Sequence, residues 1–146
     1  MKYLALIVAS LLGTTATPVS ERQSTQATIT SFSAGTNITG PGASFAYDIE
    51  IPGLATTHCS YSDTTSEIHL PTVDQTPCAD PSVRWQFRQD PSQPGGMGLY
   101  RIVVIYTPPK GGAGKSGFHE WAWNQFLQSG EETIYQGPST FTIGLD

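Results

Sequence analysis

Two alternating segments flank a turn-rich region near the middle of the chain, and this pattern limits the fold more than any other. Residues 83–88 alternate apolar and polar side chains with a period of two, which is typical of a half-buried β-strand. Residues 99–106 are the most β-prone run of the chain. The Asp-, Pro- and Gly-rich residues 89–98 between them cannot continue a strand. The sequence therefore predicts a central β-hairpin, with Cys78 just upstream of it as a covalent anchor.

The same period of two recurs along the rest of the chain. In residues 43–51 the side chains of Phe45, Tyr47, Ile49 and Ile51 share one predicted strand face, opposite small or charged residues. No segment sustains helical periodicity. Further strands are predicted at 27–32, 56–62, 66–70, 133–136 and 139–143, with loops at 73–81 and 108–117 and an ambiguous, strand-favouring segment at 118–126. The predicted fold class is all-β, a single compact antiparallel β-barrel or β-sandwich.

The first 22 residues do not follow this pattern. Residues 1–16 combine a basic start, an apolar run and small residues at the cleavage position, which is typical of a secretory signal peptide. The apolar run is shorter than the ~20 residues that cross a bilayer. Residues 17–22 are interpreted as a pro-segment cut after Arg22, with an uncut leader as the alternative. We therefore expect a secreted, extracellular β domain at 23–146.

The chain has only two cysteines, Cys59 and Cys78. Two cysteines in an exported chain usually form a disulfide. The loop-entropy model gives a bridge between these positions about 3 kcal/mol of stabilisation. Free thiols, or pairing with another chain, are the less favoured alternatives. We expect an internal disulfide bond.

Surface features restrict the partners of this domain. Asn37 begins an Asn-Ile-Thr sequon, which predicts an exposed, glycosylated loop in a secreted protein. The formal net charge is −5, and the few basic residues are scattered along the chain. Nucleic acids and anionic membranes select clustered basic surfaces, so we expect neither as a partner.

Catalytic and cofactor-binding motifs are missing from the sequence. There is no Gly-x-Ser-x-Gly elbow, and the glycine-rich residues 111–116 do not form a phosphate loop because Pro109 stands where its first glycine is needed. Asp63, Glu67 and His69 carry metal-binding groups but lack a metal-ligand spacing, so a polar strand face is expected instead. We therefore predict no enzyme activity, no cofactor and no metal.

An aromatic group near the C-terminus is the best candidate for a binding surface. If residues 118–126 form a strand, His119, Trp121 and Trp123 share one of its faces. Together with Tyr135 they are predicted as a ligand or partner surface, since aromatic rings stack on sugars and pack into partner hot spots. The alternative is that the tryptophans belong to the core. Burial of both rings would end the hypothesis of a sugar-stacking platform.

Several short strings occur in a fixed order over nearly all of residues 23–146. They are Ile29-Thr30-Ser31-Phe32-Ser33, Thr57-His58-Cys59-Ser60, Thr76-Pro77-Cys78-Ala79-Asp80-Pro81-Ser82, Trp85-Gln86-Phe87, Tyr106-Thr107-Pro108-Pro109 and Tyr135-Gln136-Gly137-Pro138-Ser139-Thr140-Phe141-Thr142-Ile143. In this order and spacing the chain resembles the fungal secreted family related to the major Alternaria allergen, which includes hypersensitive-response elicitors.

The resemblance implies a compact antiparallel β-barrel or sandwich without established enzyme activity, associated with plant recognition, defence elicitation and allergenicity. The allergen is richer in cysteine and forms a disulfide-linked dimer, whereas an internal bridge would use both cysteines here, so we expect a monomer. The expected function is that of a secreted fungal effector- or elicitor-like protein that binds a host or extracellular protein or glycan. The loops at 35–42, 89–98 and 108–117 are its expected contact surface. The alternative is a carbohydrate- or small-ligand-binding module.

Overall fold

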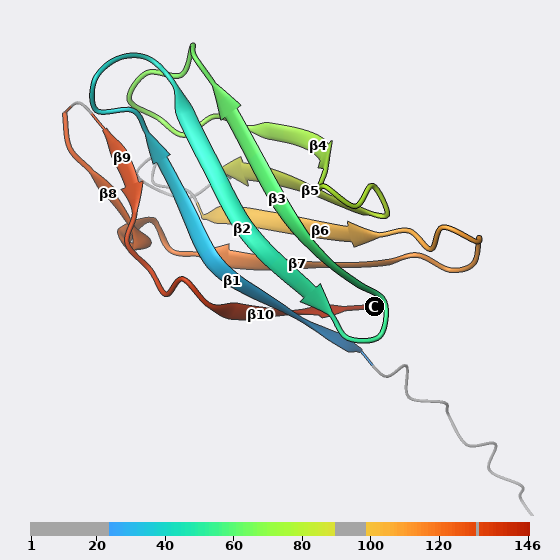
Figure 1. The fold of residues 1–146 in the computed structure, drawn as a ribbon. Coiled ribbons are helices and arrows are strands. Elements are labelled where there is room, and N and C mark those ends of the chain that lie inside the picture. The colour runs from blue at the N-terminus through green and yellow to red at the C-terminus, as the bar shows by residue number, and fades with distance from the viewer. Residues whose placement is uncertain (1–23, 90–98, 131) are drawn as a thin grey trace, which may run out of the picture.

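The computed structural model describes residues 24–89, 99–130 and 132–146, which form two antiparallel β-sheets packed as a sandwich (Figure 1). The first sheet has the order β3-β2-β1-β9-β8, with β10 also paired to β1, and the second has the order β4-β5-β6-β7. The strands are β1 (Thr25–Thr36), β2 (Ala43–Ile51), β3 (Ala55–Asp63), β4 (Val73–Pro77), β5 (Val83–Gln89), β6 (Tyr100–Tyr106), β7 (Lys115–Trp121), β8 (Phe126–Gln128), β9 (Thr133–Tyr135) and β10 (Phe141–Leu145), and a short 3₁₀ helix, η1 (Trp123–Gln125), precedes β8.

This architecture confirms the predicted all-β class and selects the sandwich over the closed barrel. The signal peptide at 1–16, the pro-segment at 17–22 and the hairpin tip at 90–98 lie outside the described residues. Within the described ranges, no helix has the length and apolar character needed to cross a bilayer.

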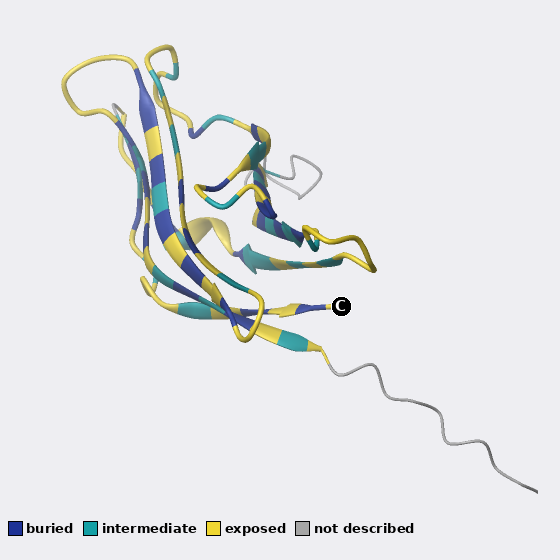
Figure 2. Ribbon diagram, turned by 45° about the vertical axis from the view of Figure 1, so that its right-hand side comes forward, coloured by how far each residue is buried: buried dark blue, intermediate teal, exposed yellow. Residues whose placement is uncertain are grey.

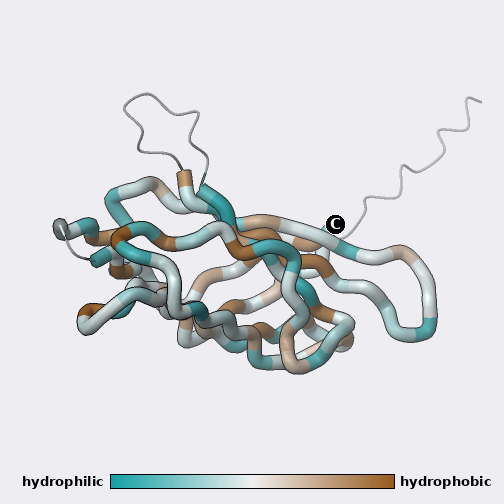
Figure 3. The backbone as a smooth tube through the Cα atoms, turned by 90° about the horizontal axis from the view of Figure 1, so that it is seen from above, coloured by the Kyte–Doolittle hydropathy of each residue, from teal (hydrophilic) through white to brown (hydrophobic). Residues whose placement is uncertain are grey.

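The alternating sequence pattern becomes the core of the sandwich. Buried and exposed residues alternate along the strands in Figure 2, and hydropathy changes in the same way along the tube in Figure 3. The predicted inward faces of β2 and β5 meet between the sheets: the ring centroids of Phe45 and Phe87 are 4.7 Å apart, and those of Tyr47 and Trp85 are 5.4 Å apart. Such tilted and edge-on aromatic pairs add about 0.5–1.5 kcal/mol each beyond the burial of apolar area. The predicted hairpin is also confirmed, since β5 and β6 pair from Val83↔Tyr106 to Gln89↔Tyr100.

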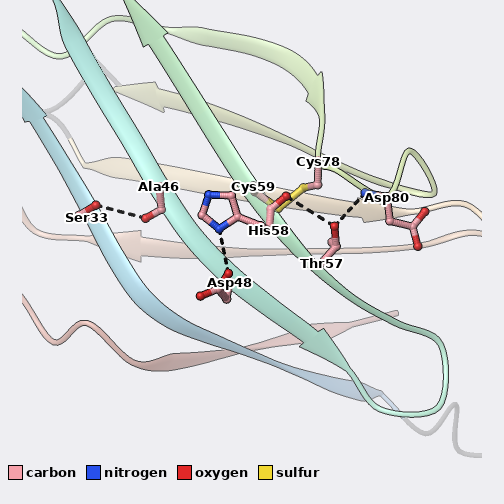
Figure 4. A network of polar contacts seen from close by, with 8 residues as sticks. All are labelled: Ser33, Ala46, Asp48, Thr57, His58, Cys59, Cys78 and Asp80. Atoms are coloured by element: carbon pink, nitrogen blue, oxygen red, sulfur yellow. Dashed lines mark hydrogen bonds and ion pairs between the residues drawn. A yellow bond between two sulfur atoms is a disulfide. The ribbon is translucent and has the colours of Figure 1, made fainter.

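The two sheets are joined by backbone hydrogen bonds along one side of the sandwich and by a disulfide along the other. On one side β10 runs beside β7, and the backbones of Ser116 and Asp146 exchange two hydrogen bonds of 3.0 Å. On the other side the disulfide Cys59–Cys78 links β3 to the segment between β4 and β5 (Figure 4). This confirms the predicted internal bridge.

Hydrogen bonds accompany the disulfide. The backbone N–H of Ala79 donates to the carbonyl of His58 at 2.9 Å. The N–H of Asp80 donates to Oγ1 of Thr57 at 2.8 Å, a bond that Figure 4 shows. The residues around Cys78 are therefore attached to β3 by both covalent and polar contacts.

The strand predicted at 66–70 is wrong, and a carboxylate explains the difference. Asp63 ends β3, and its Oδ1 accepts hydrogen bonds from the N–H groups of Ala43, Thr65 and Ser66. Its Oδ2 accepts hydrogen bonds from the hydroxyls of Ser66 and Tyr61. The carbonyl of Ser66 accepts a further bond from Gly42. These contacts hold the segment in a turn, because a backbone group used there cannot join a strand ladder.

Two predicted loops contain strand residues. Val73–Pro77, expected within the loop 73–81, forms β4 by pairing with β5. Residues 115–117, expected in the loop 108–117, begin β7 and pair with β6. Residues 115–117 contain no β-branched or aromatic residue, and Val73–Pro77 ends in a proline, so pairing with a strong neighbouring strand decides their structure over local propensity.

The hydrogen bonds that the Asp63 carboxylate accepts make the free energy of unfolding depend on pH. Partial burial raises the pKa of Asp63, but hydrogen bonds from Ser66, Thr65 and Tyr61 outweigh this effect and bring the pKa to about 2, below its ordinary value of 3.8. Because the pKa is lower in the folded protein, this carboxylate stabilises the fold fully above pH 3.8, and the stabilisation is lost as the pH falls through about 2.

We expect Asp63→Asn to lower the free energy of unfolding at pH 7 by about 1–2 kcal/mol, since the amide cannot accept all of these hydrogen bonds. The variant should also lose part of the stability change between pH 4 and pH 2. Urea titrations at several pH values measure both effects. Asp74→Asn, at an exposed position of β4, is the matched control and should follow the native protein. If the stability of the Asp63→Asn variant fell between pH 4 and pH 2 as much as that of the native protein, Asp63 would not be a source of this pH dependence.

Candidate functional site

An aromatic-lined hollow lies where β7, β9 and β10 come together. His119 and Trp121 project from the inner face of β7, Phe141 begins β10 and Tyr135 ends β9. The imidazole of His119 lies 4.8 Å from the ring of Trp121 and 4.5 Å from that of Phe141, centroid to centroid. These residues line a hollow of about 240 Å³, together with Glu120, Ala122, Gln125, Pro138 and Thr140.

His119 and Tyr135, two of the groups that line this hollow, are uncharged at neutral pH. Burial lowers the pKa of His119, and the nearby Glu120 only partly offsets the effect, so the imidazole is neutral. Burial likewise raises the pKa of Tyr135, against a smaller effect of its hydrogen bond with Trp121, and the phenol donates to the carbonyl of Pro138 at 2.8 Å. The hollow therefore offers ring edges for stacking and a neutral imidazole for hydrogen bonding, which suits a small, planar, uncharged ligand.

Three of the four residues predicted for the aromatic surface, His119, Trp121 and Tyr135, lie together in the hollow, whereas Trp123 lies outside it. Trp121 and Tyr135 contact each other at 5.5 Å and are both buried, while His119 is half-buried at their edge. The expected common strand face of His119, Trp121 and Trp123 is wrong, because β7 ends at Trp121 and Trp123 lies in η1. Trp123 is 47% exposed and does not line the hollow. A sugar platform built on both tryptophans is therefore not formed, although one ring remains exposed.

The other predicted positions are exposed and stay apart from the hollow. Asn37 lies at the surface just after β1, and its backbone N–H donates to the carbonyl of Gly42 at 2.8 Å. Its glycosylation stays a prediction. Glu67 and His69 are exposed outside any strand, whereas Asp63 is engaged in the turn described above. In the part of the chain that the structure describes, no three His, Cys, Asp or Glu residues are grouped closely enough to hold a metal ion.

A second surface, which the sequence analysis missed, covers the outer face of the second sheet. Val83, Trp85 and Phe87 point inward from β5, so Arg84 and Arg88 point outward. The pairing of β5, β6 and β7 then sets side chains in three rows across this face. The rows are Arg88–Arg101–Glu120, Gln86–Val103–Phe118 and Arg84–Ile105–Ser116. We call these nine residues the arginine face.

Charge and apolar area lie side by side on the arginine face. Nε of Arg101 donates to the carboxylate of Glu120 at 2.7 Å, and its guanidinium carbon lies 4.9 Å from the centroid of the Phe118 ring. Phe118 is nevertheless 57% exposed. Arg84 and Arg88 are exposed, and neither has a carboxylate within 4.0 Å among the described residues. Arg88 lies directly opposite Arg101, and like charges placed this way are unfavourable without a counterion.

The arginines of this face occupy outward-facing positions of the alternating pattern, so the sequence already contained part of the signal for it. Arg84 and Arg88 fill polar positions of the pattern that identified β5, and Arg101 does the same in β6. Their proximity depends on the register between β5, β6 and β7, which the period of two does not specify.

Comparisons with known proteins add no family assignment: no family model matches the chain, and a search of curated proteins finds no match.

Proposed function

We propose that this chain is a secreted, non-enzymatic fungal protein of the effector or elicitor type that acts by binding a host or extracellular partner. The resemblance of its ordered strings to the Alternaria-allergen-related family motivates the proposal. The disulfide fits an oxidising compartment outside the cytosol.

The observation that carries the proposal is the arginine face. Phe118, Val103 and Ile105 form an apolar strip across β6 and β7, and arginines lie on both sides of it. Aromatic residues and arginine are the types most enriched at the energetic centres of protein interfaces. The sandwich presents the strip on a regular sheet, so little conformational entropy is lost when a partner binds.

The hollow at His119 supports a second candidate function, that of a small-ligand-binding module. Its neutral imidazole and aromatic edges suit a small planar molecule, and its volume of about 240 Å³ is below the range of drug-sized sites. A macromolecular partner would not enter it.

Capture from plant apoplastic fluid by the immobilised protein tests the first proposal. We expect Phe118→Ser to reduce capture of the partner about tenfold, because it removes the exposed aromatic centre of the face. The melting temperature should change little, since Phe118 is mostly outside the core. Leu127→Ser, at another exposed apolar position (46% exposed), is the matched control and should leave capture unchanged. Equal capture by the native protein and the Phe118→Ser variant would refute this use of the face, and recovery of only a small molecule would favour the second candidate.

A further inference from the structure

We infer that the arginine face binds an acidic, extended segment of another protein, in which two carboxylates flank an apolar side chain. This inference rests on the proposed function and names the chemistry of its partner.

Charge complementarity gives the first argument. The chain carries a net charge of −5, yet all three arginines of the described residues lie on this one face. Among the nine residues of the face the only acidic one is Glu120, with which Arg101 already pairs, and the exposed Asp74 on the neighbouring β4 has no ion pair within 4.0 Å among the described residues. Arg84 and Arg88 therefore present two guanidinium groups to solvent, and guanidinium binds carboxylate in a bidentate geometry.

Spacing along the sheet gives the second argument. Arg84 and Arg88 are four residues apart on one strand, a separation of about 13 Å between Cα atoms. The row between them holds Gln86, Val103 and Phe118. An extended segment lying over β5 and β6 would place its side chains i, i+2 and i+4 over these three rows, with the middle side chain above Gln86 and Val103. The face therefore matches the pattern acidic–x–apolar–x–acidic.

The composition of the middle row favours a protein over a glycan. Val103 and Phe118 provide methyl groups and an aromatic ring, and the guanidinium of Arg101 already lies over that ring. A sugar polymer needs many hydrogen-bonding partners for its hydroxyl groups, and Gln86 is the only side chain of this row that supplies them. An apolar side chain between two carboxylates can pack on Val103 and Phe118 and brings to the row no polar group of its own that needs a partner.

A second copy of the chain does not fit the face as well. The outer face of the first sheet contains Asp48 and Glu50 on β2, but Asp48 already contacts His58 at 2.8 Å. The remaining outward residues of β2 and β3 are small or hydroxyl-bearing, namely Ser44, Ala46, Thr56, Ser60 and Ser62. The outward residues of β2 and β3 therefore include no large apolar group to place on Phe118.

Nuclear magnetic resonance titration of the isotope-labelled secreted protein tests the inference with a defined probe. The probe is the capped peptide Ser-Glu-Thr-Leu-Thr-Glu-Ser, and its control has lysine in place of both glutamates. We expect the glutamate peptide to shift the amide signals of β5, β6 and β7, and the lysine peptide to shift none of them. Arg88→Glu should weaken binding about tenfold, the effect of losing one charge-assisted pair.

Lys110→Glu is the matched charge control, because it changes the net charge equally in the exposed loop between β6 and β7. It should alter the dissociation constant less than about twofold, since a solvated charge outside the contact acts only through screened electrostatics. Equal losses in the two variants would overturn the inference by showing a non-specific charge effect. Binding of polygalacturonate to these strands without binding of the peptide, or concentration-dependent dimerisation through the face, would overturn it as well. The proposed function would still stand in those cases if Phe118 remained necessary for capture of the partner.

Discussion

Replacing Cys59 and Cys78 together with alanine is expected to lower the free energy of unfolding by about 3 kcal/mol. The bridge closes a loop with a sequence separation of 19 residues, and the loop-entropy model assigns this value to such a loop. For a domain of this size, the loss corresponds to a decrease in melting temperature of about 10 °C. The hydrogen bonds from Ala79 and Asp80 to β3 do not replace the bridge, since they are absent from the unfolded chain that it constrains.

Thermal unfolding followed by tryptophan fluorescence measures this effect, with and without reductant. Reductant should lower the stability of the native protein to that of the double alanine variant and leave the variant itself unchanged. Alkylation without reduction should add no mass to the native protein. A variant as stable as the native protein would show that the bridge contributes little to the fold.

Gly117→Ala is expected to destabilise the protein by about 3 kcal/mol, although alanine within a strand is ordinarily more stable than glycine. A β-carbon at this position would overlap the carbonyl oxygen of Gly144 and approach Cγ2 of Ile143 to 2.9 Å. The obstacle is backbone, so β7 and β10 must move apart, and the paired hydrogen bonds between Ser116 and Asp146 would be strained or lost.

Urea denaturation of the Gly117→Ala variant gives its free energy of unfolding. Gly130→Ala is the control, because a β-carbon there meets no atom within 4 Å, and its stability should stay within about 0.5 kcal/mol of the native value. Similar stabilities of the two variants would mean that β10 yields to the added methyl group at little cost.

The sequence predicted what depends on local pattern. Phe45, Tyr47, Trp85 and Phe87 are buried as expected, because alternation alone decides which side of a strand faces the core. The disulfide followed from the count of two cysteines together with the expectation that the chain is exported. These inferences need no knowledge of how the strands are arranged.

Other features depend on contacts between distant segments. Gly117 ends the predicted loop 108–117, but in the structure it belongs to β7, and its lack of a side chain allows the close approach of β10. Trp123 follows Trp121 by two residues, yet the chain turns into η1 after β7, and no periodic signal marks that change. The hollow at His119 and the arginine face combine three strands each, so their assembly follows from sheet order and register.

The opposite charges on the two outer faces give the sandwich an electric dipole moment. Asp48 and Glu50 lie outside the first sheet, and Arg84 and Arg88 lie outside the second, so the dipole runs across the thickness of the domain. Near a negatively charged surface, the field of that surface exerts a torque on this dipole and turns the arginine face toward the surface before contact. The torque acts only within about 8 Å of that surface at physiological ionic strength. For the acidic partner proposed above, this orientation would bring the arginine face forward although the net charge of the chain is negative.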